Sequence, residues 1–279
     1  MMFAAGIDVG STQTKAIILD GNLEVVGRSL LPTGAHITRV GEEAYKEALK
    51  NSYLPKEEIG AVIGTGYGRY KVTFGDTQIT EISCHARGSH FLFPGTRTVI
   101  DMGGQDTKAI KVGPKGEVLD FSMNDKCAAG TGRFLSSAAE VLDLTLEEIG
   151  PLSLEAVDPV RLTSVCAVFV ESDIMSYLAQ GFGVRDILGG VHRAIGARVV
   201  SLVRRVGIEK DVTFTGGVSK NVGMVRALEE LLETSINVSE ESHYAGALGA
   251  ALFALERISA EGKKHEPIRF EKWADDEGM

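Results

Sequence analysis

Cysteine, positive charge and long apolar runs are all scarce in this chain, and each scarcity excludes a class of protein. The three cysteines among 279 residues are an odd number, which argues against a disulfide framework. Asp and Glu (38) outnumber Lys and Arg (29), and the formal net charge of −9 argues against nucleic acid as the main partner. No apolar run reaches the length of a membrane span, and Asp8 interrupts the N-terminal stretch too early for a signal peptide. We expect a soluble, cytoplasmic protein with no membrane partner, and its 44% hydrophobic residues are ample for a packed core.

The usual glycine-rich nucleotide signatures are missing as well. The sequence has neither a Walker A loop nor a convincing GxGxxG dinucleotide fingerprint. Residues 64–69, GTGYGR, are rich in glycine but have the wrong spacing, and we interpret them as a loop. The chain has an internal repeat instead. IDVGSTQTKAI begins at Ile7 and IDMGGQDTKAI begins at Ile100, an offset of 93 residues with seven identities.

Each copy of the repeat predicts a β-hairpin with a phosphate-binding turn. An apolar run ends at Asp8 or Asp101, small residues follow, and an alternating pattern resumes over residues 14–19 or 107–112. A tight turn with glycine leaves backbone N–H groups free for phosphate, and a carboxylate beside it suits a hard cation. Either copy alone is equally compatible with an ordinary hairpin, but the duplication favours a nucleotide clamped between two similar halves.

A third segment, residues 212–221 with the sequence VTFTGGVSKN, fits the same site. Its pattern predicts a strand, a turn at Gly216 and Gly217, and a helix from about Ser219. Small residues in such a turn let a flat base and ribose lie against the backbone. Elsewhere, periodicity predicts helices near residues 42–52, 133–142, 187–206 and 222–232, and strands near 61–64 and 98–100.

These segments carry a resemblance to a known superfamily. Residues 7–15, 100–108 and 213–221 resemble the phosphate-1, phosphate-2 and adenosine motifs of the ATPases related to actin, hexokinase and heat-shock chaperones. The resemblance implies an α/β fold of two RNase-H-like, actin-like subdomains with a nucleotide cleft between them. It also implies two connecting helices at the hinge, for which residues 81–91 and 246–254 are the candidates.

The resemblance sets the expected domain division. We expect the first subdomain at residues 1–92 plus 243–260. The second, at residues 93–242, would carry two cysteines considered below. Residues 261–279 are charged and nonperiodic, and we interpret them as a mobile or surface tail.

The resemblance also assigns roles at the nucleotide site. Asp8 and Asp101 would hold Mg²⁺ through water, and Glu81 or Gln105 would position the attacking water. For Lys15, the alternative of a solvated hairpin residue stays open. The residues expected to bind ATP or ADP are Gly10, Ser11, Thr12, Thr14, Lys15, Gly103, Gly104, Gln105, Gly216, Gly217 and Asn221.

The three cysteines stand in different settings. Cys84 lies within the predicted helix at residues 81–91, and we interpret it as a small core residue. Cys127 precedes a helical period that starts near Thr131, and Cys166 follows residues 163 and 164, which are good helix N-caps. A thiol near a helix N-terminus is favoured as thiolate, although a buried small residue remains an alternative for each.

Two thiolates per chain are too few for an iron–sulfur cubane, which usually has four cysteine ligands. No CxxC pair or histidine cluster supplies the others. A two-fold dimer would supply them, because an isologous interface repeats each residue across its axis. The sequence therefore suggests one cluster shared between two subunits.

A closer resemblance covers almost the whole chain. NDKCAAGTGRF (124–134) and SVCAVFVESD (164–173) resemble the activators of 2-hydroxyacyl-CoA dehydratases, in the ATPase family that contains the benzoyl-CoA reductase ATPase subunits. GTGYGR (64–69), ISCHARG (82–88) and GALGAAL (246–252) extend the match. The resemblance implies a homodimer with one [4Fe-4S] cluster, held by Cys127 and Cys166 of each subunit. It would use ATP and Mg²⁺ to pass one low-potential electron from a ferredoxin or flavodoxin to an iron–sulfur acceptor enzyme.

Several alternatives stay open. The acceptor could be a 2-hydroxyacyl-CoA dehydratase, the leading choice, a benzoyl-CoA-type reductase, or a double-cubane protein. The sequence departs from the dehydratase-activator pattern in two places, residues 33–43 and the neighbours Val165 and Ala167 of Cys166. All three acceptors therefore stay open. A small-molecule kinase on the same scaffold would need a catalytic aspartate at a substrate pocket and would have no use for paired cysteines. A nucleotide sensor would bind without appreciable turnover.

Overall fold

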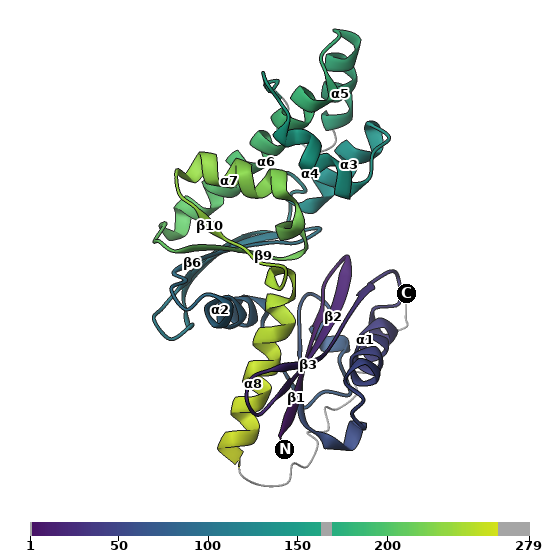
Figure 1. The fold of residues 1–279 in the computed structure, drawn as a ribbon, viewed down its shortest axis with the longest axis vertical. Helices are drawn as coiled ribbons and strands as arrows, with labels where there is room; N and C mark the ends of the chain where they lie inside the picture. The colour runs from purple at the N-terminus through teal and green to yellow at the C-terminus, as the bar shows by residue number, and fades with distance from the viewer. Residues whose placement is uncertain (1, 163–168, 262–279) are drawn as a thin grey trace, which may run out of the picture.

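The computed structural model describes residues 2–162 and 169–261. It contains two five-stranded mixed sheets, with helices packed against them (Figure 1). The first sheet has the order β3-β2-β1-β4-β5 and the second the order β8-β7-β6-β9-β10, so the two sheets share one connectivity. The strands are β1 (Phe3–Val9), β2 (Gln13–Asp20), β3 (Val25–Pro32), β4 (Ile59–Thr65), β5 (Thr77–Gln78), β6 (Thr98–Met102), β7 (Thr107–Val112), β8 (Val118–Asn124), β9 (Val212–Thr215) and β10 (Ile236–Asn237).

The repeated sequence forms the same hairpin in each sheet, which confirms the prediction. β1 pairs antiparallel with β2, and Asp8 lies opposite Lys15. β6 pairs antiparallel with β7, and Asp101 lies opposite Lys108. A third strand, β4 or β9, then runs parallel to the first strand of the hairpin. Each acid therefore sits at the same end of its sheet with a lysine across the ladder.

Two helices cover opposite faces of the first sheet. The helix α1 (Ile37–Ser52) packs on β1, β2 and β3, and α8 (Ala245–Glu261) packs on β1, β2 and β4. A separate apolar cluster fills each interface. In Figure 1, α8 begins beneath the second sheet and runs along the first, so it connects the two levels.

The helix α2 (Glu81–Leu92) is the other connection at the hinge. It packs closely against α8, and its Ala86 joins Val99 and Ile110 of the second sheet in an apolar cluster. Glycines permit the crossing, because a Cβ on Gly88 would lie 2.0 Å from the Ala245 carbonyl oxygen. Both hinge helices were predicted from the sequence. Because α2 also touches the second sheet, the predicted boundary between the two subdomains after residue 92 stays a proposal.

The second sheet carries the larger core. The long helix α6 (Val184–Val206) and α7 (Val222–Leu232) lie over it, with Phe214 fully buried beneath them. Three shorter helices continue this layer to the far end of the molecule (Figure 1). They are α3 (Gly132–Val141), α4 (Leu146–Leu154) and α5 (Val170–Ala179). Short 3₁₀ turns occur at η1 (Lys56–Glu58), η2 (Arg69–Lys71), η4 (Gly217–Lys220) and η5 (Ser242–Tyr244).

Two predicted boundaries were wrong. The first helix begins at Ile37, five residues earlier than expected, because Gly41 lies against Val9 and Val72 in the core instead of ending the helix. The predicted helix from Ser219 is a 3₁₀ turn, and α7 begins only after Asn221, whose side chain caps it. Among the described residues, no helix has the length and hydropathy that crossing a membrane requires.

Candidate nucleotide site and cysteine loop

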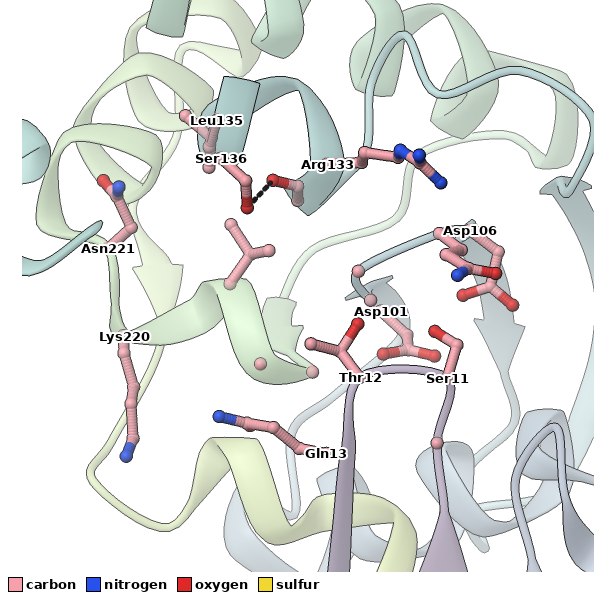
Figure 2. A pocket seen from close by; sticks show the side chains of 18 of the residues that line it. Ser11, Thr12, Gln13, Asp101, Asp106, Arg133, Leu135, Ser136, Lys220 and Asn221 are labelled. Atoms are coloured by element: carbon pink, nitrogen blue, oxygen red, sulfur yellow. Dashed lines mark hydrogen bonds between the residues drawn. The ribbon is translucent and has the colours of Figure 1, made fainter. Parts of the chain in front are cut away.

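A cavity of about 800 Å³ opens where the turns of the two hairpins meet (Figure 2). The β1–β2 turn enters from the first sheet, the β6–β7 turn from the second, and the start of α3 and α4 form the upper wall. The expected site residues that line it are Asp8, Gly10, Ser11, Thr12, Lys15, Glu81, Asp101, Gly103, Gly104, Gln105, Gly216, Gly217 and Asn221. Thr14 does not line the cavity, because it is fully buried with its hydroxyl against Thr33.

The two turns are closed in the same way. The Gly10 N–H donates to the Gln13 carbonyl at 3.1 Å, and the Gly103 N–H donates to the Asp106 carbonyl at 2.9 Å. Within the described chain, the N–H groups of the residues between them make no backbone hydrogen bond, so they are free to bind an anion. The turns also touch each other, since a Cβ on Gly104 would lie 2.0 Å from Thr12 Oγ1.

Four charged side chains are buried beneath these turns. Lys108 Nζ lies 3.4 Å from Asp101 Oδ2 and 2.8 Å from Asp106 Oδ2. Although burial opposes it, the negative charges of these two acids raise the pKa of Lys108. Lys15 is only 5% exposed, so the alternative of a solvated lysine was wrong, and burial lowers the pKa of its amine.

The two acids differ in their surroundings. Burial raises the pKa of Asp8, and the nearby charge of Lys15 only partly opposes this effect. Burial also acts to raise the pKa of Asp101, but His85 and Lys108 outweigh it and the net direction is downward. The surroundings therefore favour the carboxylate form of Asp101, whereas burial disfavours that form at Asp8.

His85 of α2 lies between the two hairpins, and the sequence analysis did not single it out. Its Nδ1 is 3.1 Å from Thr215 Oγ1 and 3.5 Å from Asp101 Oδ1. A Cβ on Gly246 would meet both His85 Nε2, at 2.8 Å, and Asp8 Oδ2, at 2.7 Å, so the ring is near both acids. The available signal was its spacing, because His85 follows Glu81 by four residues and thus shares its helix face.

Glu81 stands at the first position of α2, facing the cavity. Its Oε2 accepts a hydrogen bond from Arg69 Nη1 at 2.7 Å, and Arg69 also donates to the Gly66 carbonyl at 3.1 Å. Arg69 and Gly66 belong to the GTGYGR segment, so this loop is part of the cavity wall. Gly66 and Gly216 are equivalent in the two halves: both have positive φ, and a Cβ would lie 2.4 Å from Asp8 Oδ1 or 2.5 Å from Asp101 Oδ1.

The donor set suits magnesium better than a protein-enclosed metal. The described residues contain no group of three or more His, Cys, Asp and Glu side chains that could hold a metal ion. At its two turns the cavity offers the carboxylates of Asp8 and Asp101, and backbone donors for phosphate. Mg²⁺ in nucleotide sites is usually bound by one or two carboxylates, phosphate oxygens and water, so the residues fit this ion.

The third segment and α4 enclose the other end of the cavity. Asn221 Oδ1 accepts from the Met224 N–H at 2.9 Å, which caps α7, and lies 3.1 Å from His192 Nε2. Gly216 and Gly217 turn the chain beside it. The adjoining wall is formed by residues of α4 that the sequence analysis missed, namely Leu146, Glu147, Gly150 and Pro151.

The cysteines occupy two kinds of place where they are described. Cys84 is fully buried in α2, and burial raises the pKa of its thiol to about 12, which confirms it as a core residue. Cys127 is exposed in the loop between β8 and α3, five residues before the helix starts at Gly132. Its carbonyl accepts from Asn124 Nδ2 at 2.8 Å. Cys166 lies outside the described residues.

Comparison with known proteins agrees with this geometry. The model of the BadF/BadG/BcrA/BcrD ATPase family matches residues 5–254. The chain belongs to this family. It is 46% identical over 255 residues to the activator of lactoyl-CoA dehydratase of Anaerotignum propionicum, which covers 91% of this chain and 98% of that protein. A benzoyl-CoA reductase component of Thauera aromatica is 32% identical over 267 residues, 92% of this chain and 94% of that protein.

Solved structures extend the agreement to the fold. The chain superimposes on component A of Acidaminococcus fermentans (R)-2-hydroxyglutaryl-CoA dehydratase with a TM-score of 0.90 and 43% identity, over 93% of this chain and 100% of that one. The activator of 2-hydroxyisocaproyl-CoA dehydratase from Clostridium difficile, with bound ADPNP, gives a TM-score of 0.89 and 39% identity, over 96% of this chain and 100% of that one. The protein is therefore an actin-like ATPase of the family that contains dehydratase activators, as its motifs predicted.

Proposed function

We propose that this ATPase is the activator of a 2-hydroxyacyl-CoA dehydratase and delivers one low-potential electron per event to that iron–sulfur enzyme. The observation that carries the proposal is the exposed Cys127 loop, which is hydrogen-bonded directly to a turn of the nucleotide cavity. The Gly132 and Arg133 N–H groups, at the end of this loop, donate to the Gly103 and Gly104 carbonyls at 2.9 Å each. Full-length similarity to two dehydratase activators supports the same activity.

At the nucleotide site, the protein's part is to bind, position and neutralise charge. The free N–H groups of the Gly10–Gln13 and Gly103–Asp106 turns would cradle the phosphates, with Lys15 and Lys108 behind them. Asp8 and Asp101 would hold Mg²⁺ through water; the ion neutralises charge on the β- and γ-phosphates. Glu81 or Gln105 would orient the attacking water. The hydrogen bond from Arg69 holds the Glu81 side chain at the first turn of α2.

At the cysteine loop, Cys127 and Cys166 of two subunits would supply four thiolates to one [4Fe-4S] cluster. The exposure of Cys127 fits a site shared between copies, since a thiol buried in one subunit could not reach a partner. A cluster held there would supply one-electron storage and transfer. A ferredoxin or flavodoxin would reload it, and the dehydratase would receive the electron.

The same cavity and cysteines are compatible with two other functions. Electron delivery to a benzoyl-CoA-type reductase or a double-cubane protein uses the same cysteines, but the identity to the benzoyl-CoA reductase component is 32% against 46% for the lactoyl-CoA dehydratase activator. A kinase of small molecules would need the cavity alone. The exposed Cys127 has no part in such a reaction, so the kinase is the less favoured function.

Anoxic purification followed by acceptor reduction tests the proposal. We expect a brown protein with about four irons per dimer. With ATP and a reductant, it should reduce a purified lactoyl-CoA dehydratase, followed by electron paramagnetic resonance. A colourless protein that phosphorylates sugars or acyl groups after anoxic handling would replace this function with the kinase. A brown protein that reduces only a benzoyl-CoA reductase would change the acceptor.

A further inference from the structure

Equivalent threonines of the repeated hairpins have different hydrogen-bond partners. Thr14 and Thr107 stand at the same position of the repeat, and both are buried. Thr14 Oγ1 lies 2.9 Å from Thr33 Oγ1, and Thr33 donates to the Gly10 carbonyl at 2.8 Å. The first hairpin therefore braces its own phosphate turn.

Thr107 reaches instead into the cysteine loop. Its hydroxyl donates to the Gly130 carbonyl at 2.6 Å, across 23 residues of chain, in a buried setting. Gly130 has a φ of +85°, and a Cβ there would lie 3.1 Å from Arg198 Cβ, so the loop lies close to α6 at this point. The loop between β8 and α3 is thus tied to the second phosphate hairpin three residues after Cys127.

The β6–β7 turn serves as the N-terminal cap of α3. The first N–H groups of a helix need acceptors. The side chain of Thr131 at the N-cap makes no capping hydrogen bond, and its hydroxyl donates back to the Ala128 carbonyl at 2.8 Å. The carbonyls of Gly103 and Gly104 take that part, accepting from the Gly132 and Arg133 N–H groups. A shift of the turn must therefore displace the start of α3 or leave its N–H groups unpaired.

The other end of the loop is anchored to β8. Asn124 Nδ2 donates to the Cys127 carbonyl at 2.8 Å and to the Ala129 carbonyl at 2.9 Å. Because β8 pairs with β7, this anchor also belongs to the second phosphate hairpin. These hydrogen bonds thus connect both ends of the Cys127 loop to the β6–β7–β8 unit.

We infer that Thr107 is a positioning residue that couples the phosphate-2 turn to the Cys127 loop, so that the turn, the loop and the start of α3 move as one body. The inference rests on the proposed nucleotide site and deepens it. A phosphate bound to the N–H groups of the turn polarises the same peptide groups whose carbonyls cap α3, which strengthens the cap. Thr107 links the position of β7 to Gly130, whereas the hydroxyl of the equivalent Thr14 contacts Thr33, the residue after β3, which donates to the first turn.

Hydrogen exchange on the full-length protein tests this coupling. Exchange is measured by mass spectrometry in peptides covering residues 125–131 and 132–135, with and without a saturating non-hydrolysable ATP analogue and Mg²⁺. In the wild type we expect the analogue to slow exchange in both peptides by about fivefold or more, at the lower end of usual coupling factors. Thr107→Val removes the hydroxyl at nearly constant shape, and the response of residues 125–131 should fall to less than about twofold.

Thr14→Val is the matched control. Because its hydroxyl braces the first turn, it should raise the analogue concentration needed for saturation, but the loop response at saturation should equal that of the wild type. A Thr107→Val protein with a full response, or a wild-type loop that ignores bound analogue, overturns the inference. If Thr107→Val fails to fold, the exchange response of Thr107→Ser is compared with that of the wild type. Because serine keeps the hydroxyl, residues 125–131 should respond to the analogue as in the wild type, and a lost response would overturn the inference.

The outcomes separate the inference from the proposed function. If the protein is colourless but its loop still responds to the analogue through Thr107, the coupling is supported and the electron-transfer function is rejected. If the protein is brown and delivers electrons but its Thr107→Val variant responds normally, the function is supported and the coupling is rejected. The exchange measurement itself needs neither cluster nor acceptor.

Discussion

Asp8 and Asp101 occupy the same position in two copies of one hairpin, yet their surroundings move their pKa values in opposite directions. Burial raises the pKa of Asp8. At Asp101, burial also acts upward, but His85 and the Lys108 amine, at 3.4 Å, outweigh it and lower the pKa. The duplication has therefore kept the acids but not their surroundings: at Asp101 the charges of His85 and Lys108 outweigh burial, whereas at Asp8 the charge of Lys15 does not.

We predict that this difference appears in the stability of the nucleotide-free protein. Asp101→Asn leaves Lys108 buried with Asp106 alone, and it should lower the free energy of unfolding by about 3 kcal/mol, the lower end for breaking a buried pair. Asp8→Asn removes a carboxylate that burial disfavours, so it should cost clearly less. Urea unfolding measures both. Equal losses would mean that the two acids have equivalent surroundings.

For ATP hydrolysis, the same two substitutions should be equally damaging. If both acids hold the metal, losing either removes positioning and electrostatic stabilisation together, and we expect turnover to fall by about a hundredfold or more. The double variant should be little worse, because residues that act as a unit do not add. Asp120→Asn on the exposed part of β8 is the control, with turnover unchanged. Near-normal turnover in either single variant would remove the two-sided metal site.

The repeated hairpins could be predicted because their signal is local. An apolar run, an acid, small residues and a second alternating run specify a hairpin and its turn within eleven residues. β3 and β8 were missed because neither alternates clearly: Val25 of β3 is exposed, and so are Leu119 and Phe121 of β8. α4 was missed because Pro151 interrupts its helical pattern.

The contacts that arrange the site could not be predicted in the same way. Arg69 meets Glu81 across 12 residues, and His85 meets Asp101 between two sheets, so neither pairing has a period or a motif. Lys15 was ambiguous because a hairpin lysine is solvated or buried according to what packs above it. The roles assigned to the site residues stay predictions, and so does the ligand role of Cys166.

Cysteine chemistry should distinguish the buried thiol from the exposed one. With its pKa raised to about 12 from 9.0, Cys84 should have roughly a thousandfold less thiolate at pH 8 than an ordinary thiol. We expect iodoacetamide to modify Cys127 in the native, cluster-free protein and to leave Cys84 unmodified until the chain unfolds. Peptide mass spectrometry reads both sites. Rapid native modification of Cys84 would contradict its place in the core.

The same cysteines differ as cluster ligands. Cys127→Ser and Cys166→Ser should each abolish iron binding in anoxic preparations, while Cys84→Ser should retain about four irons per dimer. Nucleotide binding should be largely intact in all three; of the two described cysteines, neither Cys84 nor Cys127 lines the cavity. A Cys166→Ser protein with a complete cluster would disprove this ligand set.

The crossing of the two hinge helices should not tolerate side chains at its glycines. A Cβ on Gly249 would lie 1.9 Å from the Cys84 carbonyl oxygen, and one on Gly88 would meet Ala245 in the same way. Forced separation of α2 and α8 should outweigh the helix propensity that alanine gains, with a net loss of about 2 kcal/mol in each variant. Gly21→Ala is the control, because its nearest neighbour would be 3.7 Å away. Thermal unfolding distinguishes them, and an unchanged melting temperature in Gly88→Ala or Gly249→Ala would contradict the close packing.

His192 should set nucleotide affinity without touching the nucleotide. The ring is 2% exposed; Nδ1 lies 2.8 Å from the Leu188 carbonyl, and Nε2 lies 3.1 Å from the Asn221 side chain that borders the cavity. Burial lowers the pKa of His192, and the hydrogen bonds with the Leu188 carbonyl and the Asn221 side chain act in the opposite direction. His192→Leu removes the contact and frees Asn221.

We expect His192→Leu to raise the Kd for ATP by about five- to tenfold, the value of one hydrogen bond, with kcat at saturation nearly unchanged. His192→Gln, whose amide can reach the same partner, should recover most of the affinity. His36→Leu is the control, since His36 is exposed at the start of α1 and makes no capping bond. Calorimetric titration gives Kd, and a parallel turnover assay gives kcat. A loss confined to kcat would place His192 in the hydrolysis step, and wild-type affinity in His192→Leu would show that Asn221 holds its position without the ring.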